Sequence, residues 1–208
     1  MKLHISFNQE SLHAALECAN QVVSWCDAFR LGPVLLFSRG MSAVLAFKHA
    51  FPQKELICET KISDHEKEII DTVFKAGGQA VSILCNTHRN IIRSAVLHAH
   101  NRNMRCFLDL IGSQTLTQNA LDAAELGVDT LQVHYQLSFS QQESIQEQWE
   151  LLKNNTKLPI FISTGINRNT IDTAIKLSPA GLIIGGSITD QAAPKDEAEF
   201  FYRKIRAV

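Results

Sequence analysis

The chain repeats one pattern eight times, a short apolar run followed by a longer amphipathic run. The short runs have the length and composition of buried strands, and the longer runs carry apolar residues at helical spacing. Consecutive short runs end roughly 22 to 29 residues apart, which is the length of one strand plus one crossover helix. The predicted strands cover residues 3–7, 28–31, 56–58, 80–84, 106–111, 130–134, 159–163 and 181–184.

Eight nearly equal units in a chain of 208 residues favour one α/β fold, a single (β/α)8 TIM barrel. Doubly wound sheets also alternate strands with helices, so the alternation alone leaves that fold open. A chain of 208 residues that is 45% hydrophobic is long enough to bury a large core. No linker or shift in composition divides the units, and we therefore expect one barrel domain over residues 1–208.

Composition excludes several classes of protein. The net charge is −1 and no basic stripe is present, which argues against a nucleic-acid partner. No apolar run is long enough to cross a bilayer, and residues 1–8 lack a signal-peptide core, so we expect a cytoplasmic protein without a membrane partner. The five cysteines are odd in number and show no CxxC spacing, which favours buried thiols over disulfides or a zinc site.

A charged cluster stands at the end of the third predicted strand. Alternate residues of a strand point to one face, so Glu59 and Lys61 are expected to project together. Asp64 lies beyond the strand and is predicted to be the N-cap of the next helix. We consider these three residues candidate catalytic groups. The alternative interpretation is a solvent-exposed strand end with an incidental ion pair.

Other predicted strand ends also carry polar residues, and barrel enzymes place their active sites at these ends. His134 is a candidate catalytic residue, and Asn8, Arg30 and Asp109 are candidate substrate-binding residues. Titratable groups that converge on one barrel mouth shift each other's pKa values, as is typical of active sites. The alternative for His134 is a structural histidine with satisfied hydrogen bonds.

The last two strand ends carry glycine-containing loops. Backbone N–H groups at such positions can approach a ligand closely, and barrels bind phosphate after strands seven and eight. Glycine pairs are usually only turns, but two such loops at these two strand ends predict a phosphorylated small-molecule substrate. The candidate phosphate-binding residues are Thr164, Gly165, Gly185, Gly186 and Ser187.

The order and spacing of these motifs resemble the orotidine 5'-monophosphate decarboxylase suprafamily. Within it, the pattern is most similar to 3-hexulose-6-phosphate synthase and 3-keto-L-gulonate-6-phosphate decarboxylase. The resemblance runs from Met1 to the last predicted helix without large gaps. The matching pattern consists of Glu59-x-Lys61-x-x-Asp64, Asp71-x-x-Phe74-Lys75-Ala76-Gly77, Asp109-Leu110-Ile111-Gly112, His134 and the two glycine loops.

The resemblance implies a homodimer in which Asp64 is donated across the interface to the neighbouring site. It also implies a Mg2+ ion, held by strand-end carboxylates, that stabilises an enediolate formed from a keto-sugar phosphate. The matching lysine, Lys61, would stabilise the developing oxyanion and help to deliver a proton. His134 matches a family histidine assigned to proton transfer.

Three positions depart from the family pattern. Asn8 and Glu59 stand where the relatives carry aspartate, and Arg30 stands where they carry glutamate. A guanidinium repels a hard cation that prefers oxygen ligands, so we expect weak or absent Mg2+ binding, and the metal ligands are unknown.

Two interpretations of these departures remain open. In the first, Arg30 pairs with Glu59 and replaces the charge of the ion, and the protein is a lyase that works without metal. In the second, the same pair is structural, and the protein is a non-catalytic phosphosugar-binding barrel. A further possible activity is decarboxylation of orotidine monophosphate.

Overall fold

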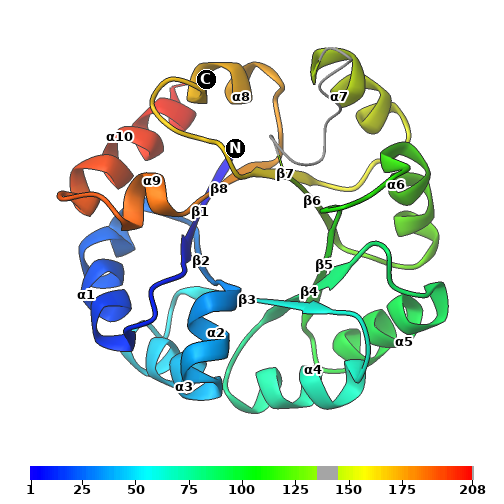
Figure 1. The fold of residues 1–208 in the computed structure, drawn as a ribbon, viewed down its shortest axis with the longest axis horizontal. Coiled ribbons are helices and arrows are strands. Elements are labelled where there is room, and N and C mark those ends of the chain that lie inside the picture. Colours follow the sequence, from blue (N-terminus) through cyan, green and yellow to red (C-terminus); the bar gives the residue numbers. More distant parts are fainter. Residues whose placement is uncertain (135–144, 208) are drawn as a thin grey trace.

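The computed structural model describes residues 1–134 and 145–207. Eight parallel strands form a closed barrel in sequence order, with the helices arranged around it (Figure 1), so the predicted (β/α)8 TIM barrel is confirmed. The strands are β1 Lys2–Phe7, β2 Ala28–Leu31, β3 Glu55–Ile62, β4 Ala80–Leu84, β5 Arg105–Asp109, β6 Thr130–His134, β7 Ile160–Ser163 and β8 Gly181–Ile184. The helices are α1 Leu12–Val22, α2 Pro33–Arg39, α3 Met41–Ala50, α4 Glu66–Lys75, α5 Arg89–His100, α6 Leu116–Glu125, α7 Ile145–Asn154, α8 Ile171–Lys176, α9 Gly186–Thr189 and α10 Pro194–Arg206, with a 3-10 turn at Val23–Trp25.

The core has two parts because each strand is covered on both faces. A large apolar cluster fills the space between the strands and the helices. A smaller cluster forms a separate layer of the core, and its members come from the strands. This layer is tightly packed, since a Cβ atom added at Gly181 would lie 2.2 Å from the ring of Phe161. The smaller cluster consists of Ala28, Ile57, Ala80, Phe107, Phe161 and Ile183.

His4 is a buried histidine that packs against this layer. Its ring centroid lies 4.4 Å from that of Phe161, and the residue is 1% exposed. Its Nδ1 has no hydrogen-bond partner among the described residues. Burial, followed by the charges of Arg30, Lys2 and Arg105, lowers the pKa of His4 well below its ordinary value. The folded protein therefore holds His4 in its neutral form.

We expect the neutral His4 to make folding pH-dependent. Below pH about 6.5 the unfolded chain binds a proton at His4 that the folded chain does not, so stability falls by about 1.4 kcal/mol for each further pH unit. His4→Phe should flatten this slope in urea unfolding measured between pH 5 and 7.5. His49→Phe, at an exposed position of α3, should keep it. Equal slopes in wild type and His4→Phe would contradict a neutral buried histidine.

The connection between β2 and β3 contains two helices. Gly32 and Pro33 follow the predicted second strand, residues 28–31, and such a pair is typical of a turn after a strand. Pro33 instead opens α2, because its fixed φ suits the first position of a helix. Gly40, with φ of +60°, then separates α2 from α3.

The start of α4 also differs. Asp64 was predicted to be the N-cap, and this prediction is wrong. The N-cap is His65, which adopts left-handed backbone angles (φ 48°, ψ 35°) and makes no side-chain capping bond. The helix starts at Glu66 because β3 continues to Ile62, four residues beyond the predicted strand end at residue 58.

Two further expectations concern cysteines and membranes. All five cysteines are free and buried, which confirms the prediction of buried thiols. Within residues 1–134 and 145–207, no helix has the length and apolar character needed to span a bilayer.

Candidate active site

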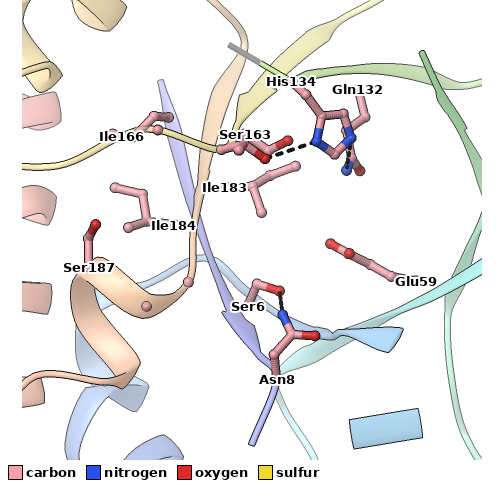
Figure 2. Close-up of a pocket in the computed structure, with 14 residues that line it drawn as sticks. Ser6, Asn8, Glu59, Gln132, His134, Ser163, Ile166, Ile183, Ile184 and Ser187 are labelled. Atoms are coloured by element: carbon pink, nitrogen blue, oxygen red, sulfur yellow. Dashed lines mark hydrogen bonds between the residues drawn. The ribbon is translucent and has the colours of Figure 1, made fainter. Parts of the chain in front are cut away.

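A cavity of about 370 Å³ opens at the carboxyl ends of the strands (Figure 2). Glu59 points into it, with Gln132 and His134 on one side and Ser6 and Asn8 on the other. The loops after β7 and β8 close the remaining wall. The lining residues with predicted roles are Asn8, Glu59, His134, Thr164, Gly165, Gly185, Gly186 and Ser187.

Four of the predicted site residues are not part of this lining. Arg30 and Asp109 are buried and bond to residues of the wall. Lys61 is partly exposed, with 28% of its side chain accessible. Asp64 is exposed in the loop between β3 and α4. The structure thus places every predicted residue except Lys61 and Asp64 in the cavity wall or in contact with it. Lys61 is linked to the wall indirectly, through its bond to Asp109.

Arg30 and Glu59 form an ion pair, as both interpretations of the sequence expected. Nε of Arg30 donates to Oε1 of Glu59 at 2.8 Å, and its Nη2 donates to Oε1 of Gln132. The guanidinium is fully buried and lies 4.7 Å from the centroid of the Phe107 ring. Burying a charge in this way requires a partner of opposite sign, which Glu59 supplies.

A second group of charges joins β3, β5 and β6. Oδ2 of Asp109 accepts from Nζ of Lys61 at 2.7 Å, and Oδ1 lies 2.7 Å from Nε2 of His134. Burial raises the pKa of Asp109, but hydrogen bonds and charges from His134 and Lys61 outweigh it and lower the pKa to about 2. Asp109 is therefore ionised at neutral pH.

The ionised Asp109 determines where His134 carries its proton. A carboxylate 2.7 Å from Nε2 can only accept, so Nε2 must carry a hydrogen and donate it. The other ring nitrogen, Nδ1, lies 2.9 Å from Oγ1 of Thr164. In the neutral ring Nδ1 accepts from the threonine hydroxyl, and in the protonated ring it donates.

A distortion of β3 separates the members of the predicted charged cluster. The register between β3 and β4 shifts between Cys58 and Ile62, and Lys61 has φ of 47°, which is unusual for a residue with a side chain. The backbone N–H of Lys61 donates to Oγ of Ser82 at 2.9 Å. As a result Lys61 bonds to β5 while Glu59 bonds to β2, and Asp64 lies apart from both.

Gln132 is a central residue of the site that the sequence analysis did not assign. Its Oε1 accepts from Arg30, and its Nε2 lies 3.3 Å from Nε2 of His134. Gln132 thereby lies between the two groups: it is bonded to the Arg30–Glu59 pair and is in contact with the group of Lys61, Asp109 and His134. The spacing along β6 could have identified Gln132 from the sequence, because residues 132 and 134 share one face of the strand. A polar residue in an apolar run also needs a hydrogen-bond partner.

The two predicted phosphate loops lie together in the cavity wall. Thr164 and Gly165 have left-handed φ values of 58° and 77°. Gly186 and Ser187 form the first turn of α9, where backbone N–H groups have no acceptor within the helix. Among the described residues no lysine or arginine lines the cavity, so a phosphate there would meet backbone donors and hydroxyls.

The strand-end residues do not suit a hard divalent cation. At the three positions where the resemblance implies carboxylates, only Glu59 is acidic, and its Oε1 already accepts from the buried Arg30. Within the part of the chain that the structure describes, no group of three His, Cys, Asp or Glu residues is arranged to hold a metal ion. The donor set and the adjacent guanidinium both disfavour Mg2+ at this position.

Comparisons with known proteins agree with this fold. The chain is 29% identical over 202 residues to 3-hexulose-6-phosphate synthase of Bacillus subtilis, covering 96% of this chain and 94% of the relative. The solved 3-hexulose-6-phosphate synthase of Salmonella typhimurium is 27% identical, with a TM-score of 0.91 over 100% of this chain and 99% of that one.

A more distant structure shares the fold. It is KGPDC of Streptococcus mutans, which is 18% identical with a TM-score of 0.88 over 100% of this chain and 98% of that one. Residues 1–201 match the sequence pattern of a single family. The chain therefore belongs to the Orotidine 5'-phosphate decarboxylase / HUMPS family.

Proposed function

We propose that the protein is a lyase that acts on a keto-sugar phosphate through an enediolate intermediate, as a 3-hexulose-6-phosphate synthase-like enzyme. The observation that carries the proposal is that one cavity combines two glycine loops with His134, whose Nε2 donates to an ionised Asp109. The names of the relatives support the substrate class, since two are 3-hexulose-6-phosphate synthases. Both an aldehyde-lyase and a carboxy-lyase reaction pass through such an intermediate.

In this proposal the phosphate binds the backbone N–H groups of the two loops and holds the reacting carbons near β3 and β6. Binding energy from a remote phosphate serves to position the reacting atoms. Fixed neutral donors, the side-chain amides of Asn8 and Gln132, line the cavity and would meet the oxygen on which charge develops. Lys61 lies outside the lining but is partly exposed; it uses one of its three N–H donors on Asp109, which leaves two for a ligand that reaches it.

His134 supplies and removes the proton in this scheme. Asp109 holds the proton on Nε2 and stabilises the imidazolium that forms when Nδ1 is also protonated. The chain's own residues therefore bind the phosphate, meet the developing charge and move a proton, and no step requires a divalent ion.

The proposal is tested by incubating the protein with hexulose 6-phosphate, with ribulose 5-phosphate plus formaldehyde, and with 3-keto-gulonate 6-phosphate. Each reaction is followed by phosphorus and proton NMR, with EDTA and with added Mg2+. We expect cleavage or condensation of at least one substrate in the presence of EDTA. No turnover under either condition would contradict a lyase.

A second candidate function is a non-catalytic phosphosugar-binding barrel. It is favoured by the internal pairing of both site cations, because Arg30 bonds to Glu59 and Lys61 bonds to Asp109. This candidate predicts that ribulose 5-phosphate raises the melting temperature without being converted. It also predicts that Lys61→Ala leaves the affinity unchanged, whereas a lyase requires Lys61 for turnover.

We further propose a homodimer in which Asp64 serves the neighbouring site. Asp64 is exposed and lies outside the cavity of its own chain. Helix α2 exposes two large apolar side chains, Phe37 at 90% and Val34 at 45%. Exposed apolar residues grouped on one helix are typical of an interface.

Mixing two inactive variants tests this arrangement. We expect Lys61→Ala and Asp64→Ala each to abolish turnover, because each removes a group from every site. Unfolding and refolding them together should restore activity, since mixed dimers then contain one site with both residues. Activity that returns only after the subunits have exchanged supports a site shared between two chains. Light scattering measures the oligomeric state, and a monomer in solution would contradict the homodimer.

A further inference from the structure

Thr164 lies beside His134 in the cavity wall. Its Oγ1 is 2.9 Å from Nδ1 of His134, and both residues line the wall. The opposite ring nitrogen, Nε2, is held by Asp109 at 2.7 Å. Both nitrogens of His134 are thus engaged within the protein, and a proton that leaves Nδ1 meets the threonine hydroxyl first.

The backbone of Thr164 is held in a conformation that disfavours threonine. Its φ of 58° lies in the left-handed region, where a β-branched residue is a genuine outlier and glycine is favoured. Thr170 fixes the loop, because its Oγ1 donates to the carbonyl of Gly165 at 2.6 Å and accepts from the N–H of Asn167 at 2.9 Å. Strain of this kind at a cavity wall, imposed by its surroundings, points to a role for the side chain.

We propose that Thr164 is a proton relay between His134 and the ligand. The inference rests on the proposed function, because it requires a ligand that accepts a proton. The protonated ring of His134 gives its Nδ1 proton to Oγ1 of Thr164, while the threonine hydroxyl gives its own proton to the carbon of the enediolate. One proton passes from His134 to the ligand, the threonine is unchanged, and Asp109 retains its bond to Nε2.

This role separates the side chain of Thr164 from the phosphate. The sequence analysis placed Thr164 among the phosphate-binding residues, but its hydroxyl is bonded to His134. A hydroxyl has a single hydrogen to donate, so it cannot donate to a phosphate and to the reacting carbon at once. The phosphate is then held by the backbone of the two loops.

Three substitutions at Thr164 separate the hydroxyl from the backbone. Thr164→Ser keeps the hydroxyl, Thr164→Val replaces it with a methyl group of similar shape, and Thr164→Gly removes both the hydroxyl and the strain. The measured quantities are the rate at which ribulose 5-phosphate takes up deuterium from D2O, its affinity by calorimetry, and the side-chain nitrogen NMR shifts of His134.

We expect Thr164→Val to slow deuterium uptake at saturation by about tenfold or more, with little change in affinity. Its His134 Nδ1 resonance should shift, whereas Thr164→Ser should stay close to wild type in all measurements. Thr164→Gly should exchange as slowly as Thr164→Val and unfold at a higher temperature, because glycine relieves the strain.

The outcomes distinguish this inference from the proposed function. Deuterium uptake by Thr164→Val at the wild-type rate would overturn the relay and leave the proposed function standing. A loss of affinity in Thr164→Val with an unchanged rate at saturation would also overturn it, because the hydroxyl would then serve binding. A wild-type protein that binds the sugar phosphate without any deuterium uptake would overturn the relay and the lyase but not phosphosugar binding.

Discussion

Replacing Arg30 by methionine is expected to lower the free energy of unfolding by about 3–5 kcal/mol. The substitution leaves Glu59, which is only 9% exposed, without its counter-charge, and it removes the donor to Gln132. Breaking a buried pair from one side is costly because the remaining charge stays desolvated. Urea unfolding followed by circular dichroism at pH 7 measures the loss.

Two comparisons identify the cause of the expected loss. Arg168→Met breaks a bidentate pair with Glu197 that is largely exposed, so it should cost about 0–1 kcal/mol. Adding Glu59→Gln to Arg30→Met should recover much of the stability, because the unpaired charge is gone. Wild-type stability of Arg30→Met would show that the pair is not desolvated.

Replacing Asp109 by asparagine is expected to reduce turnover by about 10²–10⁴-fold. An amide in this position presents one acceptor oxygen to two donors, Nζ of Lys61 and Nε2 of His134. Its NH2 group must then face one of these donors. His134 then loses the group that holds its proton on Nε2 and stabilises the imidazolium. Steady-state kinetics should show the loss in kcat, because the phosphate loops that bind the ligand remain intact.

The same variant has a distinct stability profile in acid. The folded pKa of Asp109 is about 2, below the value of about 3.9 in an unfolded chain. Its contribution to stability is therefore complete above pH about 4 and is lost as the pH falls toward 2. Asp109→Asn should lack this loss.

Asp71→Asn is a matched control for the kinetic prediction. Asp71 also bonds to a histidine and to an arginine but lies on the surface, so this variant should leave kcat unchanged.

The barrel was predictable from sequence because each unit must bury one strand and one helix face, and that requirement sets a regular spacing. Details of single units were not predictable in the same way. Pro33 follows β2 as a strand terminator would, yet it also fits the first position of α2. The extension of β3 depends on a register shift at Lys61, which is stabilised by Ser82 from the neighbouring strand.

In the candidate site, too, the positions of residues were predictable from the sequence but the bonds between them were not. Strand-end positions placed Asn8, Glu59 and His134 in the cavity wall, because parallel strands end at one face of the barrel. The bonds between these residues depend on which strands face each other across the interior. Gln132 and Thr164 acquire their importance from partners on β2 and β6 that lie far away in sequence.

The central claim is that the site carries out proton chemistry on a sugar phosphate without a divalent ion, at strand ends where the Arg30–Glu59 pair stands at positions that the resemblance assigns to metal ligands. The most direct test measures conversion of the sugar phosphate, and its deuterium uptake, by EDTA-treated protein as Mg2+ is added, together with calorimetry of Mg2+ binding. We predict the same rate at every Mg2+ concentration and no micromolar binding. A rate that appears only with Mg2+ and saturates with micromolar binding would contradict the claim.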